Sequence, residues 1–493
     1  MARHVSFALR RRIYLFSERY YWFMHSPWAG GVMLVIFMLL ALLLGNLPAT
    51  KECYYGILHR NFTIGFDGFA LSKSIEHWIN DGLMVIFFFY VGLEIKREII
   101  AGELSSPRKA AMPIAAAIGG MLFPAIIYLL FNAGGEAASG WGIPMATDIA
   151  FAIGVLSLLG NRVPLSLKVF LTALAIVDDL GAILVIALFY STEINVTLLI
   201  AAGVVFLFLI LLNRLHVYAM KFYLIPSIVL WILFLYSGVH ATIAGVLIAL
   251  TIPAVPRYSK PYFIRKTRHF INEFRHRDIP GVEVLCNPRQ LRTLLMKRKV
   301  TASTISPAQR LEHSLHHTVA FFIMPVFALA NAGVEFAGPE DLHVLHSSQG
   351  LGIILGLVIG KPLGIMLMSW LVWRMGLATL PHGVNWKMLT GVACLGGIGF
   401  TMSIFIDNLA FATPSFKLPS WPLRPWPPCW DWCGCNLPCE KLEQNVDPWG
   451  MANAENYFAK GVLNSLNLFM FAFAFSDSIL FGRRDILILR KRR

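Results

Sequence analysis

The chain has 493 residues, of which 57% are hydrophobic and 14% are charged. Soluble globular proteins carry about 25% charged residues, so this composition argues against a cytosolic enzyme and predicts a polytopic membrane protein. The formal net charge of +14 does not indicate a nucleic-acid partner. The basic residues gather in segments between apolar runs, as they do in the cytoplasmic loops of membrane proteins.

Eleven apolar runs between residues 28 and 411 predict membrane helices. They lie near 28–47, 80–99, 111–131, 142–160, 165–190, 196–212, 222–236, 239–253, 314–334, 350–374 and 386–411, and a weaker twelfth lies near 462–481. Three arginines, Arg10 to Arg12, precede the first apolar run, and no cleavable signal peptide is apparent. We therefore expect a cytoplasmic N-terminus. The connecting segments then alternate in charge as the positive-inside rule requires, and the most basic of them, 257–310, is cytoplasmic.

Two of the predicted spans are interrupted. Gly142-Ile143-Pro144 precedes the apolar part of the fourth, and the stretch GGIGFTMS (396–403) divides the eleventh. Backbone at membrane depth can leave the helical form only where it lines a cavity or is buried in protein. Broken helices in corresponding halves of a chain are typical of transporters with inverted repeats and a binding site near the bilayer midplane. The sequence therefore predicts an all-α polytopic fold with two broken, crossing helices.

Two adjacent carboxylates, Asp178 and Asp179, lie in the middle of the apolar run 171–190. One Asp at the centre of a membrane helix costs about 2.5–3.5 kcal/mol on insertion scales, and two like charges also repel each other. Packing therefore does not explain the pair, whereas a site that takes up protons or a small cation does. Consecutive residues point about 100° apart on a helix, so the two carboxylates cannot have identical roles.

Four further charged residues stand out within the predicted spans: Asp81 and Glu94 toward opposite ends of the second, Asp148 beside Thr147 in the broken fourth, and Lys361 in the tenth. Crossing broken helices point their partially charged ends at one another, so a carboxylate and an ammonium can neutralise them there. For Asp148, charge compensation and cation binding both remain open. His240, at the outer end of the eighth span, is more typical of a hydrogen-bonded helix end than of a pH switch.

Seven stretches resemble the NhaA sodium/proton antiporter family. They are INDGLMVIFFFYVGLEIKRE (79–98), 144–190, SGVHATIAGV (237–246), RLEHSLHH (310–317), MPVFALANAGV (324–334), IGKPLGI (359–365) and GGIGFTMSIFI (396–406). The resemblance covers about residues 20–411. It implies a homodimeric, multi-pass protein of the bacterial inner membrane with twelve helices. It further implies export of Na+ or Li+ against proton entry, activation at alkaline pH and no cofactor.

The resemblance also implies roles for residues by their position. Asp178 and Asp179 match the cation- and proton-binding pair. Thr147, Asp148 and Lys361 match the helix-crossing assembly, with Lys361 as the partner of Asp178. The residues expected to respond to pH are Glu94, Glu98, Glu312 and His313, to which we add His240. Since two acids offer up to two protons per monovalent cation, we expect the exchange to move net charge.

The chain departs from the family in two places, which leads us to expect three parts. An antiporter domain spans 1–411, and its basic cytoplasmic loop 257–310 is expanded; we expect this loop to be solvated and to attract anionic lipid head groups. Segment 412–456 is rich in Trp, Pro and Cys and cannot form an ordinary span. Segment 457–493 could supply a last helix and a basic cytoplasmic tail.

Two other functions use intramembrane acids. An aspartyl protease holds two facing carboxylates from separate helices that share a proton, and here Asp148 would have to face the adjacent pair. A sodium-coupled solute symporter would bind Na+ at the same carboxylates, but the sequence offers no additional polar set for an organic substrate.

Overall fold

The computed structural model describes residues 28–411 together with residues 24 and 26, apart from short gaps at 67–68, 135, 160–162, 192–193, 280–283 and 335–346. These residues belong to one unit, which spans residues 1–434. The predicted segments 412–456 and 457–493, including the twelfth helix, lie outside the described residues.

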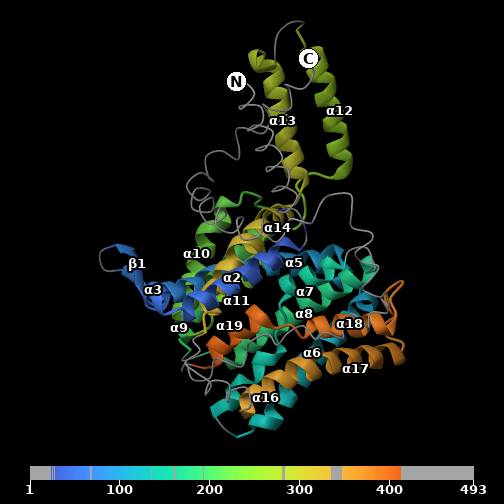
Figure 1. The fold of residues 1–493 in the computed structure, drawn as a ribbon. Helices are drawn as coiled ribbons and strands as arrows, with labels where there is room; N and C mark the ends of the chain where they lie inside the picture. The colour runs from blue at the N-terminus through green and yellow to red at the C-terminus, as the bar shows by residue number, and fades with distance from the viewer. Residues whose placement is uncertain are drawn as a thin grey trace, which may run out of the picture. The chain divides into compact units, whose positions relative to one another are not determined.

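The described residues are predominantly helical (Figure 1), which confirms the predicted all-α class. Its first helices are α2 (Ala29–Asn46), α3 (Pro48–Leu58), α4 (Ile75–His77), α5 (Met84–Ala101), α6 (Pro107–Asn132), α7 (Ile149–Leu158), α8 (Leu165–Phe189), α9 (Val196–Arg214), α10 (Lys221–Tyr236) and α11 (Thr242–Thr251). The later ones are α12 (Lys260–His276), α13 (Pro288–Thr304), α14 (Pro307–Thr318), α15 (Met324–Asn331), α16 (Ser348–Leu355), α17 (Lys361–Arg374), α18 (Trp386–Gly396) and α19 (Phe400–Ala410). Short π or 3₁₀ segments adjoin several of them: η1 (Trp78–Leu83), η2 (Glu103–Ser105), η3 (Glu136–Met145), η5 (Val284–Cys286), η6 (Val319–Ile323) and η8 (Gly356–Gly360).

Each of the eleven segments predicted as helices before residue 411 is largely helical. Among the described residues, seven helical segments are long and apolar enough to cross a membrane, or eight if the bent pair α18 and α19 is one span. The predicted count of twelve spans is not reached by this criterion. Helices α10 and α11 have 16 and 10 residues, fewer than the roughly 20 that a span needs. Helix α5 carries four charged residues near its end.

Both predicted interruptions are present and lie against each other. The 3₁₀ segment η3 gives way to the non-helical residues 146–148 before α7 begins, and Asp148 has an extended backbone. Helices α18 and α19 bend by 42° at residues 397–399. The backbone N–H of Asp148 donates to the carbonyl of Ile398 (2.8 Å), so the two breaks are joined directly.

Helices α6 and α17 pack closely because two glycines face each other. A Cβ atom on Gly119 would lie 2.1 Å from the carbonyl oxygen of Gly364, and one on Gly364 would lie equally close to the carbonyl of Gly119. Small residues allow membrane helices to approach backbone to backbone. Gly364 is one helical turn after Lys361, so this contact fixes the part of α17 that carries the buried lysine. The π segment η8 ends immediately before that lysine, as π-bulges often do near functional sites.

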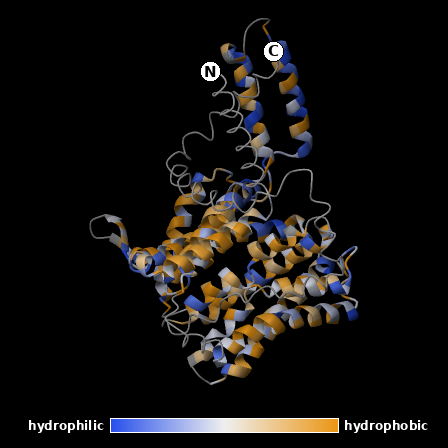
Figure 2. Ribbon diagram, viewed as in Figure 1, coloured by the Kyte–Doolittle hydropathy of each residue, from blue (hydrophilic) through white to orange (hydrophobic). Residues whose placement is uncertain are grey.

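Two hairpins project from the helices that they connect (Figure 1). One is an antiparallel pair of strands, β1 (Asn61–Phe66) and β2 (Phe69–Ser74), with Asn61 opposite Ser74 and Phe66 opposite Phe69. The other is the helical pair α12 and α13. Residues 257–310, expected to be a solvated loop, are therefore mostly helical. In Figure 2 most helices are dominated by apolar residues, whereas α12 and α13 carry apolar and hydrophilic residues in alternation.

Candidate functional site

The site is built where the interrupted segments meet α8 and α17. Helix α8 contributes Asp178 and Asp179, α17 contributes Lys361, and the non-helical residues before α7 contribute Thr147 and Asp148. All five side chains are buried, with at most 2% of each residue exposed to solvent. The structure thus brings together the five residues that the sequence singled out at membrane depth.

Asp148 caps two helices at once. Its Oδ1 accepts a hydrogen bond from the backbone N–H of Phe151 (3.0 Å) in the first turn of α7. Its Oδ2 accepts from the backbone N–H of Thr401 (3.3 Å) and from the Thr401 hydroxyl, in the first turn of α19. A carboxylate is favoured at helix N-termini because it satisfies free N–H groups and lies at the positive end of the helix dipole. This geometry gives Asp148 a charge-compensating position.

Lys361 joins α17 to α8 and to the end of η3. Its Nζ donates to Asp178 Oδ2 (2.7 Å) and also to the backbone carbonyl of Met145. The Thr147 hydroxyl lies between the same Asp178 Oδ2 and the carbonyl of Gly396 (3.0 Å), the last residue of α18. A buried charge is tolerated when it is paired and hydrogen-bonded, and here an ammonium and a carboxylate satisfy each other.

Asp179 has a different environment from its neighbour. It forms no ion pair with any described residue, and its Oδ2 accepts no hydrogen bond from them. Asp178 Oδ1 likewise accepts no hydrogen bond from a described residue, while Asp178 Oδ2 is paired with the ammonium of Lys361. Buried carboxylate oxygens that no protein donor reaches can still accept a proton or a hard cation, which prefers oxygen ligands. The pair therefore offers one engaged carboxylate and one open one.

A second charged cluster joins the ends of α5 and α14. Arg97 pairs with Glu312, with Glu98 (3.0 Å) and with Glu94 (3.5 Å). Glu98 also accepts a hydrogen bond from the backbone N–H of Glu103 (3.1 Å). His313 does not share this burial: it is exposed, whereas Glu312 next to it is buried.

His240 lies near η1, which precedes α5, whereas the Arg97 cluster lies near the C-terminal end of α5. Its Nε2 is 3.0 Å from the carbonyl of Tyr190, so the ring must donate there. Burial lowers the pKa of His240, while the hydrogen bond to Tyr190 and the charge of Asp81 act in the opposite direction. His240 and Asp81 both line a cavity of about 400 Å³.

The sequence did not assign a role to two members of these clusters, Arg97 and Thr401, or to one further buried acid, Asp407. Arg97 pairs with all three carboxylates of the α5–α14 cluster, and its position within a run of charged residues was the available signal. Thr401 follows the glycines of the eleventh span and lies in the first turn of α19, where free backbone N–H groups need a hydrogen-bond acceptor. Asp407 is buried in α19, and the rule that marks any acid in an apolar span as functional would have selected it.

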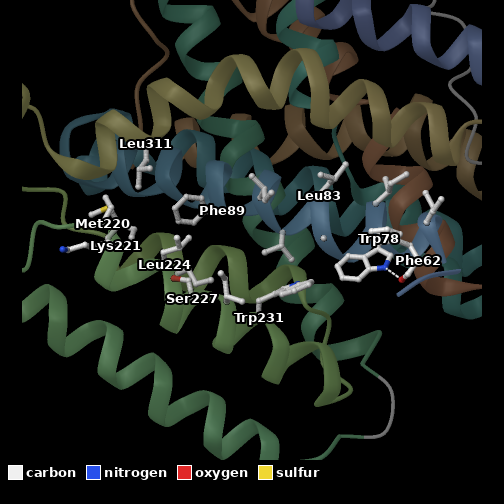
Figure 3. Close-up of a pocket in the computed structure, with 18 residues that line it drawn as sticks. Phe62, Trp78, Leu83, Phe89, Met220, Lys221, Leu224, Ser227, Trp231 and Leu311 are labelled. Carbon is white, nitrogen blue, oxygen red and sulfur yellow. Dashed lines mark hydrogen bonds between the residues drawn. The ribbon is translucent and has the colours of Figure 1, made fainter. Parts of the chain in front are cut away.

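A larger cavity, of about 810 Å³, lies between α5 and α10 (Figure 3). Its walls are almost entirely apolar, with Trp78 and Trp231 toward one end and Lys221 toward the other. The five buried residues at the helix crossing do not line it, so this cavity is separate from the charged site.

Comparison with known proteins agrees with this geometry. The family model described as Na+/H+ antiporter 1 matches residues 21–419. The Na(+)/H(+) antiporter NhaA of Oleidesulfovibrio alaskensis is 51% identical over 387 residues, covering 78% of this chain and 86% of that protein. Na(+)/H(+) antiporter NhaA 2 of Syntrophotalea carbinolica is 50% identical over 384 residues, and the NhaA of Sulfurimonas denitrificans is 48% identical over 390. These alignments cover 78% and 79% of this chain, and 87% of each relative. The chain belongs to the Na+/H+ antiporter 1 family.

Proposed function

We propose that the protein is a secondary active antiporter that exports Na+ or Li+ in exchange for protons. Its place is the bacterial inner membrane, with the N-terminus in the cytoplasm. The observation that carries this proposal is the buried carboxylate pair at the crossing of two interrupted helices, in which Asp178 is paired with Lys361 and Asp179 is open. Intramembrane acids that face the protein interior typically mark ion or proton pathways.

In the proposed mechanism Asp179 is the principal ligand of the cation. Within the pair, Asp179 Oδ2 and Asp178 Oδ1 are buried oxygens that accept no hydrogen bond from a described donor. A Na+ ion held there draws on the same negative charge that protons neutralise. The cation and the protons therefore exclude each other at this site. Exchange results when the site opens to one side of the membrane with the cation bound and to the other side with the protons bound.

Asp178 is the proposed proton carrier. Its Oδ2 is held by Lys361, so protonation of this carboxylate removes the charge that the ammonium faces. The ammonium keeps its contact with the Met145 carbonyl, which can hold it in place while Asp178 is neutral. With one proton on each carboxylate, two protons replace one Na+, and each cycle moves one net charge.

Regulation by pH is proposed for the Arg97 cluster. Glu94, Glu98 and Glu312 surround one arginine, so the net charge of the cluster changes with the protonation of any of them. Since Glu312 lies on α14 and the other two on α5, that charge acts between two helices. Assembly as a homodimer is proposed from the family resemblance alone.

The experiment that tests the function uses everted membrane vesicles with a preset pH gradient. Addition of Na+ or Li+, without an organic solute, is expected to collapse the gradient over part of the range between pH 6 and about 9. A gradient that stays intact at every pH in this range, with both aspartates present, would contradict the proposal. Collapse that requires an organic solute as well would favour a symporter.

A further inference from the structure

The hairpin formed by α12 and α13 carries most of the net positive charge of the protein. Residues 257–304 contain twelve Lys or Arg residues and three Asp or Glu residues, a net charge of +9 out of +14 for the whole chain. Within the described part of this hairpin, the acid Glu273 of α12 is already paired with Arg277 (2.7 Å) and lies near His269 (4.0 Å). Internal ion pairs therefore leave a large positive charge on the surface.

Helix α12 has a half-buried face of phenylalanines and a second, exposed stripe. Phe263, Phe270 and Phe274 are half-buried, at the i, i+7, i+11 spacing of one helix face. A different face, with the same periodicity, carries Ile264 and Ile271, which are 58% and 49% exposed. Because both isoleucine side chains are about half exposed, packing within the hairpin does not account for them.

Arginines complete the exposed stripe of α12. Ile264, Arg268, Ile271 and Arg275 follow one another at positions i, i+4, i+7 and i+11, so they form one row along the helix. Arg268 and Arg275 are exposed, and neither is in an ion pair with a described residue. Helices that lie in a membrane interface combine large apolar side chains with Lys and Arg, whose long stems let the charged ends reach the head groups.

Helix α13 repeats the same composition on its outer surface. Gln290 and Thr293 are buried toward the hairpin interior. The exposed side carries Leu291, Leu294, Leu295 and Met296, with Leu295 56% exposed, together with Arg292 and Lys299. Four large apolar residues within six positions are more than a freely solvated helix requires.

Both ends of the hairpin are fixed at the ends of membrane helices. Helix α11 ends at Thr251, and the backbone N–H of Ala308, in the first turn of α14, donates to the carbonyl of Pro253 (3.2 Å). The backbone N–H of Arg257 and that of Tyr258 donate to the carbonyl of Ser303 (3.1 and 3.3 Å), which closes the base. A helix of 17 residues is about 25 Å long, so the whole hairpin lies within roughly that distance of its base.

We propose that the α12–α13 hairpin docks onto the anionic lipid surface of the surrounding membrane, through the stripe Ile264, Arg268, Ile271 and Arg275 and the exposed face of α13. Anionic head groups match the net charge, and the interfacial region accepts the apolar side chains. A nucleic acid or an acidic protein would match the charge but would leave the isoleucines and leucines without a function. The proposal does not depend on which ion the protein transports.

The test measures how fast an acetylating reagent modifies individual lysines in the full-length protein, reconstituted in nanodiscs and analysed by mass spectrometry. One set of discs contains phosphatidylcholine alone and the other includes phosphatidylglycerol. Lys260 and Lys299, both exposed on the hairpin, are the reporters, and Lys387 at the start of α18 is the internal reference for a general effect of the charged bilayer. We expect the reporters to react several-fold more slowly in anionic discs, relative to Lys387. We also expect this protection to disappear near 1 M salt, where the Debye length is about 3 Å.

Two pairs of charge variants separate a docked face from diffuse attraction. Arg268→Gln with Arg275→Gln removes two charges from the stripe, and Arg265→Gln with Lys266→Gln removes two from other faces of the same helix. The first pair is expected to abolish the protection of Lys299, and the matched second pair to preserve it. Ile264→Ser with Ile271→Ser keeps every charge and is also expected to abolish it.

Three outcomes would overturn the proposal. The reporters could react equally fast in both kinds of disc, or the two charge pairs could reduce protection to the same extent. Alternatively, protection could be absent with anionic lipid but appear when RNA or polyglutamate is added to discs of phosphatidylcholine, which would assign the surface to a different class of partner.

Discussion

Asp178 and Asp179 are neighbours in sequence with unequal surroundings, and the difference allows their roles to be separated. Asp179→Asn removes a full negative charge and a proton site while keeping the shape of the side chain. We expect Na+-driven proton flux in everted vesicles to fall to the level of vesicles without the protein. Asp179→Glu, which retains the charge, is the control and is expected to keep part of the flux. Normal exchange by the Asn variant would refute the assignment of Asp179.

Lys361 and its partner Asp178 are both buried, so removal of the lysine leaves an unpaired buried charge on Asp178. Breaking a buried ion pair from one side typically costs about 3–5 kcal/mol. We therefore expect Lys361→Ala to lower the Tm of the purified protein and to reduce turnover. Lys361→Met combined with Asp178→Asn removes both charges and is expected to recover the Tm but not transport. An unchanged Tm for Lys361→Ala would show that the pair does not stabilise the fold.

His240 gives a stability effect whose sign follows from its environment. Its pKa is lowered by burial, so the folded protein binds fewer protons at this site than the unfolded chain. The neutral ring makes its full contribution above the ordinary pKa of about 6.5, and this contribution is lost as the pH falls below that value. We expect His240→Gln to weaken the fall in Tm between pH 7.5 and 5.5. A fall in Tm of the same size in the parent protein and in the His240→Gln variant would contradict the assignment.

At the scale of elements, the approach of α6 to α17 determines where Lys361 lies. Gly119→Ala would place a methyl group 2.1 Å from the Gly364 carbonyl, so the helices would have to separate. Overpacking of this kind costs about 1–3 kcal/mol. We expect a lower Tm and a loss of transport, since the lysine would move with α17.

Gly203 provides the matched control for this substitution. It also lies inside a helix, α9, but nothing is within 4 Å of an added Cβ atom. Gly203→Ala should therefore leave transport intact and stabilise the helix by about 0.5–1 kcal/mol. If the two alanine variants behave alike, close packing of α6 and α17 does not position the site.

Some of the elements could be predicted from the sequence and others could not. Hydrophobic runs and the glycines of 142–144 and 396–403 predicted the helical segments and both interruptions, because these depend on local composition. The contact between Asp148 and Ile398 joins residues 250 positions apart and has no local signature. The α12–α13 hairpin was predicted as a loop although its start signal was present: Asn287 precedes Pro288, and its side chain accepts from the N–H groups of Arg289 and Gln290. The high charge density of this segment led us to predict a loop, although the capping residue Asn287 and Pro288 are typical of a helix start.

For the whole molecule, the proposed exchange of two protons for one Na+ predicts a response to voltage alone. One net charge per cycle corresponds to about 2.3 kcal/mol per 100 mV. In proteoliposomes with equal pH on both sides, an inside-negative potential of 100 mV should therefore drive Na+ out to a final gradient of roughly 40-fold, at tenfold per 1.4 kcal/mol. The potential is set by a K+ gradient with valinomycin, and radioactive Na+ reports the distribution.

The orientation of the protein in the proteoliposomes does not affect this result, because two protons entering as one Na+ leaves carries one positive charge inward from either side. Liposomes containing Asp179→Asn protein control for leakage. A one-for-one exchanger moves no net charge, so its Na+ distribution would not respond to the potential. A final Na+ gradient that is the same with and without valinomycin would therefore leave antiport intact but exclude the assignment of one proton to each of the two aspartates.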